Sequence, residues 1–328
     1  VLEGDVLPLI RQAVAGCSGF SETNHGRYVA FDYSADRGGG GVAGMFPPPE
    51  RHHRGSRERW LAAARRECRG LLLCAATGAV LARRFHKFWN IDEVSEAAAE
   101  HVGPLRRGRC SLHLKLDGSL ASPLLLPTVA SAADGGTGSD EAGNDARGGS
   151  AGVGGDLVWA TRGLLSDAIA RHVAAAAKRG ERHSQLARTW LGRGYTPLYE
   201  WCEARRAAGQ VQHARDGLTL LALRHMVTGE YVASQEVARA AAAFGVPLAP
   251  LMSVADALGS DGTPPAAVPA ATVGRGGRSA TAAAASDDDD EEEEEDKEDE
   301  EEEEFDLEAV RRAVGAWVGV EGAVLRVE

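Results

Sequence analysis

The amino-acid sequence predicts an α+β fold in which antiparallel sheets alternate with intervening helices. Short apolar runs are separated by turn-forming pairs such as Asp117-Gly118 and Thr228-Gly229, a pattern typical of strands. Longer segments between these runs place apolar residues four positions apart, as on one face of a helix. With 328 residues, 44% of them apolar, the chain is long enough for one large domain or two ordinary ones.

The expected strands are apolar runs bounded by turn residues. The first two flank a turn at residues 76–78, and the third is broken at Asp117-Gly118. In chain order the expected strands cover residues 71–75, 79–85, 111–116, 157–161, 196–201, 218–224, 230–233 and 322–328.

Helices are expected at residues 164–179, 184–191 and 235–244. In the first helix, apolar residues four positions apart form one stripe: Leu165, Ile169, Val173 and Ala177. Ser234 is expected to cap the last helix, and Gly245 is expected to end it.

Two segments contain too few apolar residues to pack into a core. Residues 131–155 are rich in Gly, Ser, Ala and Asp, and residues 254–304 are rich in Ala, Gly and Pro before they become acidic. Both are predicted to be disordered. We therefore expect one domain over residues 1–253 with an insertion at 131–155, a linker at 254–304, and the last strand of the same domain within 305–328.

The formal net charge of −12 comes from one acidic tract, residues 287–304. Without the 17 acids and one lysine of this tract, the chain has 35 basic and 31 acidic residues, a net charge of +4. The rest of the chain is thus mildly basic, which permits a polyanionic substrate without requiring one. The tract itself is interpreted as a solvated spacer rather than a tail for a basic partner or a mimic of RNA.

Little in the sequence indicates a membrane or an oxidising compartment. No apolar run reaches the roughly 18 residues of a membrane span, and no secretory signal follows Val1. The five cysteines form no CxxC pair or zinc-like cluster, which favours a reducing, intracellular compartment that the sequence does not resolve further. We expect no membrane partner.

The strongest chemical motif is Lys115-Leu116-Asp117-Gly118-Ser119. Here a lysine ends an apolar strand, and a glycine close by leaves room for a phosphate. A lysine can act as a nucleophile when burial or nearby cations lower its pKa. Alone, however, this motif is short, and a lysine before a turn is usually a solvated rim residue.

Further motifs accompany Lys115 in a fixed order. They are Glu67-Cys68-Arg69-Gly70-Leu71, then Arg84-Phe85-His86-Lys87-Phe88-Trp89-Asn90, Leu198-Tyr199-Glu200-Trp201, Arg224, Thr228-Gly229-Glu230-Tyr231 and Glu321-Gly322-Ala323-Val324. This series resembles the phage T-even RNA ligase family within the covalent nucleotidyltransferases, which include DNA ligases and capping guanylyltransferases. The resemblance covers about residues 26–247 and 305–328.

The resemblance implies a nucleotidyltransferase (ATP-grasp-like ligase) domain with ATP and Mg²⁺ as cofactors. In this family the motif lysine attacks the α-phosphate of ATP, AMP passes to an RNA 5′-phosphate, and an RNA 3′-hydroxyl displaces AMP. The implied partner is RNA with 5′-phosphate and 3′-hydroxyl ends, in RNA repair or tRNA splicing, and the implied state is a monomer.

The resemblance also assigns roles to residues of this sequence. It makes Lys115 the nucleophile, and it places Arg69 and Lys87 on the ATP phosphates. Glu200 and Glu321 would engage the ribose or hold Mg²⁺ through its water shell. Asp117, two residues after Lys115 and on the same strand face, would help to orient the site, next to Gly118. Arg162 stands where the family usually carries a lysine.

Several of these residues could instead have a purely structural role. Arg69 and Lys87 could be surface charges at a hairpin, whereas Glu200 is an unusual acid within an apolar strand and needs a partner. Three tryptophans could stack on a base but are better explained by core packing: Trp89, Trp159 and Trp201. His86 and His113 are interpreted as structural or exposed.

The sequence departs from the family pattern at two places. The stretch from Ala204 to Val211 lacks the usual Asn-Arg pair, and no lysine follows Glu321, where the family carries paired lysines. We therefore expect a chain that stops before its last catalytic motif at Glu328. Two alternatives stay open: an inactive nucleotide- or RNA-binding remnant, and a capping-type guanylyltransferase that uses GTP.

Overall fold

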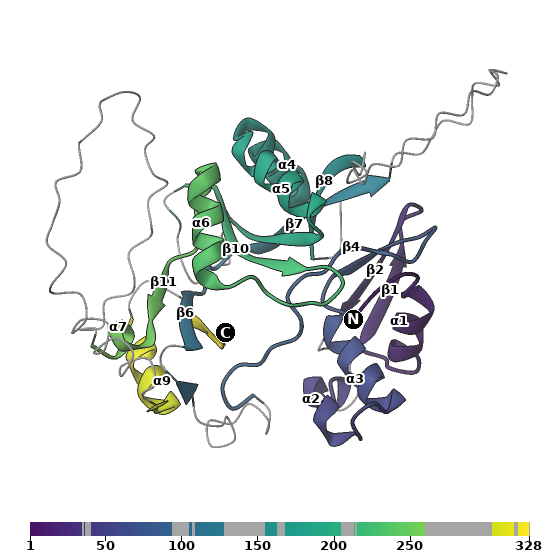
Figure 1. Ribbon diagram of the computed structural model, residues 1–328, viewed down its shortest axis with the longest axis horizontal. Helices are drawn as coiled ribbons and strands as arrows, with labels where there is room; N and C mark the ends of the chain where they lie inside the picture. Colours follow the sequence, from purple (N-terminus) through teal and green to yellow (C-terminus); the bar gives the residue numbers. More distant parts are fainter. Residues whose placement is uncertain are drawn as a thin grey trace, which may run out of the picture.

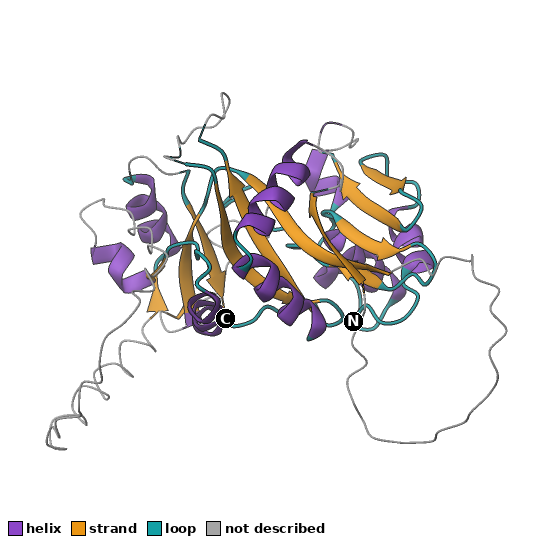
Figure 2. Cartoon of the chain, turned by 90° about the horizontal axis from the view of Figure 1, so that it is seen from above, coloured by secondary structure: helices purple, strands orange, loops and turns teal. Residues whose placement is uncertain are grey.

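The computed structural model shows helices packed on antiparallel sheets, which confirms the predicted α+β class (Figures 1 and 2). It describes residues 1–34, 36, 41–93, 105–106, 109–127, 155–162, 168–204, 213, 215–259, 304–317 and 321–327. The described strands form four sheets with the orders β1-β2-β3-β4, β10-β9-β7-β8, β11-β6-β13 and β12-β5.

The N-terminal sheet lies between helices and the central sheet. Its strands are β1 (Phe20–Asn24), β2 (Tyr28–Tyr33), β3 (Leu71–Cys74) and β4 (Val80–Ala82); its helices are α1 (Leu7–Val14), α2 (Gly41–Met45), η2 (Pro49–Arg51) and α3 (Arg57–Glu67). Leu71 and Leu73 pack with α1 and α3, whereas Leu72, on the opposite face, packs with Leu124 of the central sheet. Both faces of β3 are therefore covered, which explains its continuous apolar run.

The central sheet carries helices on one face (Figure 1). Its strands are β7 (Ser119–Pro127), β8 (Gly155–Thr161), β9 (Tyr195–Cys202) and β10 (Gly217–His225); the covering helices are α4 (Ala168–Arg179), α5 (Arg182–Gly192) and α6 (Ser234–Phe244). Tyr199 and Trp201 pack in the core beneath these helices. Because side chains alternate along a strand, Glu200 lies on the other face.

The third sheet brings distant parts of the chain together. β6 (Cys110–Leu114) lies between β11 (Leu251–Ser253) and β13 (Ala323–Val327). Beside it lie the pair β5 (Leu105–Arg106) and β12 (Glu304–Phe305) and the helices α7 (Val254–Gly259) and α9 (Leu307–Gly315). Ala323 pairs with Leu114, so the end of the described chain returns to the strand before Lys115.

Most of the expected elements are observed, but three expectations are wrong. Residues 230–233 form only an isolated bridge between Tyr231 and Arg224, not a strand. Ala233, rather than Ser234, is the N-cap of α6. The hydroxyl of Ser234 does not cap the helix but lies 3.0 Å from Nε2 of His113. The linker was predicted to begin at residue 254, yet α7 begins there because Val254 and Ala257 are buried.

The structure also adds β7, which the sequence analysis did not predict. β7 pairs with β9 only through residues 119–121 and with β8 from Ala121 onward. Pro123 therefore lies beyond the ladder with β9, where its missing N–H costs no hydrogen bond to that strand.

Other expectations concern residues that the structure does not describe. Of the predicted insertion at 131–155, only Gly155 is described, and it begins β8. The acidic tract is described only at Glu304, in β12. Among the described helices, none combines the length and apolar character that a membrane crossing requires.

Candidate active site

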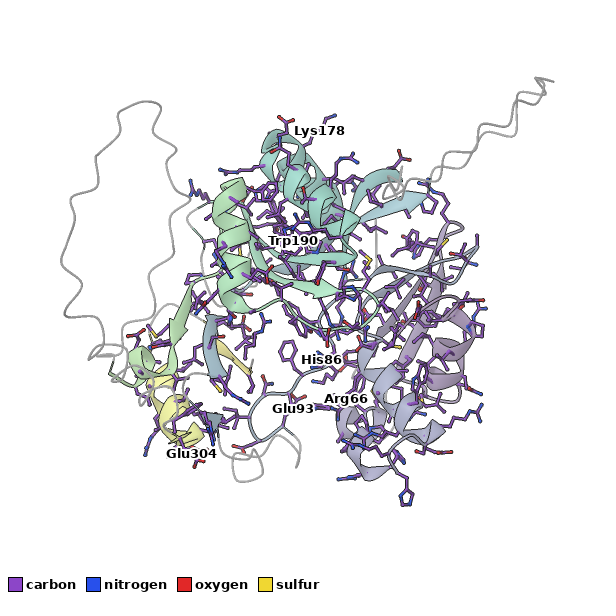
Figure 3. The ribbon with its side chains drawn as sticks, in the orientation of Figure 1. Arg66, His86, Glu93, Lys178, Trp190 and Glu304 are labelled. Carbon is purple, nitrogen blue, oxygen red and sulfur yellow. The ribbon has the colours of Figure 1, made fainter. Side chains whose placement is uncertain are left out.

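A cavity of about 1280 Å³ lies between the N-terminal, central and third sheets. Strand β2 contributes Asp32, β9 contributes Glu200, and β13 contributes Arg326. The charged and histidine residues that line it are Asp32, Arg69, His86, His113, Lys115, Arg162, Glu200, Glu230, Glu321 and Arg326. Figure 3 shows His86 in the middle of the molecule, between the N-terminal part and the third sheet. Five of the sequence-predicted site residues with charged side chains thus meet in one cavity.

Lys115 lies directly after β6 and forms an ion pair with Glu321. The backbone N–H of Lys115 donates to the carbonyl of Gly322 at 2.9 Å, which fixes the two segments side by side. The Lys115 side chain keeps 40% of its surface exposed. A lysine that is held in place yet accessible from a cavity meets the geometric needs of a nucleophile.

Gly118 brings the loop after Lys115 against strand β9. A Cβ atom at this position would clash with the carbonyl oxygen of Trp201 and lie 2.9 Å from Cγ of Glu200. Only glycine allows this approach, because the opposing atom belongs to the backbone and cannot rotate away.

The family resemblance of the sequence implies that Lys115 reacts with a nucleotide. If it does, Gly118→Ala should slow that reaction about 100-fold, since displacements of about 1 Å near reacting groups cost that much. The rate is measured in a single turnover with labelled nucleotide. Gly192→Ala is the matched control, because a Cβ there meets nothing within 4 Å. Equal rates in Gly118→Ala and Gly192→Ala would show that the close packing of Gly118 against β9 does not affect the reaction.

Two arginines provide positive charge on the side of the cavity near β2. Arg162 donates from Nε to Asp32 and from Nη2 to the carbonyl of Tyr33, each at 2.9 Å, and its guanidinium lies 4.6 Å from the centre of the Tyr33 ring. Arg69 lies 5.1 Å over the Phe88 ring, and its Nη1 is buried with no hydrogen-bond partner among the described residues. A buried donor without a partner is costly unless a ligand accepts its hydrogen bond.

Electrostatics in this region follow from burial. Burial lowers the pKa of Arg69, and the nearby charge of Arg162 lowers it further. Burial raises the pKa of Asp32 although Arg162 opposes the shift. Two guanidinium groups near one compensating carboxylate favour an anionic ligand.

Glu200 and Glu321 both line the cavity and have the donor atoms that Mg²⁺ prefers. Among the described residues, no group of three or more His, Cys, Asp or Glu side chains is arranged around a common metal position. Mg²⁺ usually takes only one or two protein carboxylates and keeps waters and substrate phosphates as its other ligands.

Lys87 and Asp117 lie outside the lining of the cavity. The ammonium of Lys87 is 3.2 Å from a carboxylate oxygen of Glu93 and 4.1 Å from the centre of the Trp89 ring. The expectation that Asp117 shares a strand face with Lys115 is wrong, because β6 ends at Leu114. The backbone oxygen of Asp117 contacts Nε2 of His213 at 2.7 Å.

The sequence analysis missed the environment of His113. Its Nε2 lies 3.1 Å from the hydroxyl of Ser111 and 3.0 Å from that of Ser234, and His113 lines the cavity. The sequence did contain a signal for the contact between Ser111 and His113. The two residues are two positions apart in an expected strand, and alternate residues of a strand lie on the same face.

A second missed feature is the aromatic wall formed around Tyr231. Arg224 and Arg326 place their guanidinium groups 4.9 and 5.2 Å from the centre of its ring, and Phe85 stacks on it at 5.8 Å. Nδ1 of His86 is 2.9 Å from the Tyr231 hydroxyl. Burial lowers the pKa of His86 to about 4, and the charge of Arg224 acts in the same direction, so this imidazole is neutral near pH 7.

Comparison with known proteins identifies the family. The family model of the T4 type, described as RNA ligase, matches residues 67–260, more than half of the chain. Two solved structures of an archaeal ATP-dependent RNA ligase, forms 2 and 1, are 12% identical to this chain with TM-scores of 0.40. They are matched over 78% and 76% of this chain but only 55% and 54% of their own, so the chain spans about half of their length. No curated protein matches the chain. By the extent of the family match, this chain belongs to the T4-type RNA ligase family.

Proposed function

We propose that this chain is the adenylyltransferase part of an ATP-dependent RNA ligase that joins RNA 5′-phosphate and 3′-hydroxyl ends in RNA repair or tRNA splicing. The observation that carries the proposal is the pairing of Lys115 with Glu321 at a cavity that Arg69 and Arg162 also line. Nucleophile, carboxylate and cations thus come from four distant parts of the chain. The match to an RNA ligase family supports RNA as the substrate.

The first step would use Lys115 as the nucleophile. Nζ of Lys115 reacts as the free amine, so its pairing with Glu321 must be released before the attack. The amine then attacks the α-phosphorus of ATP, a P–N bond forms, and the P–O bond to pyrophosphate breaks. Arg69 and Arg162 would bind the phosphate oxygens, where charge develops during phosphoryl transfer.

Later steps would use the same cavity. An RNA 5′-phosphate oxygen displaces Lys115 from AMP, and an RNA 3′-hydroxyl then displaces AMP to form the phosphodiester. Glu200 and Glu321 would hold Mg²⁺, which neutralises phosphate charge when bound. Released from the ammonium, Glu321 would be free for that role. Gly118 lets the loop after Lys115 approach Glu200, because a Cβ atom at this position would lie 2.9 Å from Cγ of Glu200.

The test is self-labelling followed by mapping of the label. The chain is incubated with Mg²⁺ and α-labelled ATP or GTP, and the modified residue is identified by mass spectrometry. AMP on Lys115 is the expected result. GMP on Lys115 would instead indicate a capping-type guanylyltransferase. Nucleotide binding without any label, in a chain shown to be folded, would support an inactive remnant.

A further inference from the structure

The helices α4 and α5 carry positive charge that the proposed chemistry at Lys115 does not use. Six exposed cations lie on or directly after them, and we call five of these the basic helix face: Lys178, Arg179, Arg182, Arg188 and Arg193. The only acid between residues 168 and 193 is Glu181. This region is therefore strongly basic within a chain whose total charge is negative.

The fold directs these cations away from the protein. Val173 and Ala177 of α4 and Leu186 and Trp190 of α5 are buried against the central sheet. The polar sides of both helices consequently point outward. Figures 1 and 3 show the two helices at the outside of the molecule, with Lys178 near the outer end of α4.

The basic helix face also lacks acidic partners among the residues that the structure describes. Some exposed arginines elsewhere are paired with acids: the shortest side-chain N–O distances are 2.6 Å for Arg11–Glu22, 3.8 Å for Arg27–Asp156 and 2.8 Å for Arg311–Asp92. No cation of the basic helix face forms such a pair with a described residue. Like charges gathered without partners repel one another.

The stability of the helices does not explain all of these charges. Lys178 and Arg179 lie in the last turn of α4, where positive charge suits the helix dipole. Arg182, however, occupies the first turn of α5, where positive charge opposes the dipole. A partner with negative charge would offset both this effect and the mutual repulsion.

RNA has the chemistry that such a surface fits. Its phosphates are regularly spaced anions, and guanidinium groups bind two phosphate oxygens at once. The basic helix face lies across the central sheet from the cavity, because Tyr199 and Trp201 pack toward the helices whereas Glu200 lines the cavity. RNA that reaches this face is therefore distant from the ends at Lys115.

We propose that the basic helix face binds the sugar–phosphate backbone of the substrate RNA at a distance from the ends to be joined. This rests on the proposed function, in which RNA is the substrate. Binding at this face is independent of sequence and sensitive to salt. It raises the affinity for long or folded RNA and leaves short oligonucleotides unaffected.

The test compares two triple variants that lose equal charge. The first is Lys178→Gln, Arg182→Gln and Arg188→Gln, since glutamine preserves helix propensity. The second is Arg11→Gln, Arg27→Gln and Arg311→Gln, at exposed positions that have acidic partners. Fluorescence anisotropy measures the affinity of each full chain for a folded RNA with blocked ends, over a range of salt concentrations.

The first triple variant is expected to bind folded RNA about tenfold more weakly than wild type, with the slope of log K against log salt reduced by about 2. The second should resemble wild type. Unchanged affinity in the first variant, or equal losses in both, overturns the proposal. Charge-dependent binding to phosphatidylserine vesicles, with RNA affinity unchanged, would also overturn it and identify a membrane surface instead.

Self-labelling separates this proposal from the proposed function. Labelling of Lys115 by ATP needs no RNA, so the first triple variant should label at the wild-type rate. If neither wild type nor the variants become labelled by ATP, the proposed function is wrong. The comparison of RNA affinities would still test the basic helix face. If labelling is normal and RNA affinity is unchanged, only the role of the basic helix face fails.

Discussion

Replacing Lys115 with arginine should reduce self-adenylylation to background while leaving the fold intact. Arginine keeps the positive charge that Glu321 binds, and Lys115 is 40% exposed, so the longer side chain can be accommodated. A guanidinium group, however, stays protonated under all ordinary conditions and has no free lone pair for attack on phosphorus. The substitution therefore removes the proposed nucleophile and preserves the positive charge beside Glu321.

The matched control is Lys178→Arg, at an exposed position on α4 away from the cavity. Incorporation of α-labelled ATP is followed with time for both variants, and circular dichroism verifies folding. The control should label like wild type. Labelling that persists in Lys115→Arg would mean that another residue is the nucleophile, and the assignment of Lys115 would be wrong.

The motif around Lys115 could be found from the sequence because its signals are local. A strand-like run, a lysine at its end and an Asp-Gly turn lie within a few residues. The partner of Lys115 could not be found in the same way. Glu321 is 206 residues away and reaches Lys115 only because β13 pairs with β6. Family resemblance suggested both residues, but their ion pair depends on tertiary structure.

The two predicted phosphate-binding cations show why pattern alone was insufficient. Arg69 and Lys87 were interpreted alike, yet Arg69 lines the cavity with a buried Nη1 while Lys87 pairs with Glu93 beside Trp89. Which basic side chain faces the cavity depends on the path of the chain before β3 and after β4. A sequence shows that such a residue is charged but not where its side chain points.

Secondary structure was most predictable where residues within one segment, without distant partners, decide where the helix forms and ends. The helices α5 and α6 have a clear apolar stripe, and Gly245 ends α6 with a φ of 64°. Predictions failed where a distant partner decides the outcome, as for Ser234, whose hydroxyl contacts His113. β7 was missed although its pairing with β8 and β9 builds the centre of the sheet.

The buried carboxylate of Glu67 shows how much stability such distant pairing can carry. Its two oxygens accept hydrogen bonds from both Arg83 and Arg224 at 2.8–3.0 Å, and these arginines are 5% and 3% exposed. Glu67 ends α3, Arg83 follows β4, and Arg224 belongs to β10. One carboxylate therefore joins the N-terminal part to the central sheet.

Glu67→Gln should lower the free energy of unfolding by about 3–5 kcal/mol, because it leaves two buried guanidinium groups without a counter-charge. Urea denaturation at pH 7 measures the change. Glu22→Gln is the control: its ion pair with Arg11 is exposed to solvent and should contribute little to stability. A loss of similar size in both variants would show that the buried network adds nothing beyond a surface pair.

The pH dependence gives an independent test of the same network. Burial alone would raise the pKa of Glu67, but hydrogen bonds from Arg83 and the charges of Arg224 and Arg83 lower it from 4.5 to about 2. Because the folded-state pKa is the lower one, this carboxylate stabilises the fold above pH 4.5, and the stabilisation is lost as the pH falls toward 2. Wild type should therefore lose stability more steeply than Glu67→Gln over this range, and parallel curves would contradict the lowered pKa. Since Arg224 also lies against Tyr231 at the cavity wall, loss of the network should loosen that wall as well as the contact between the sheets.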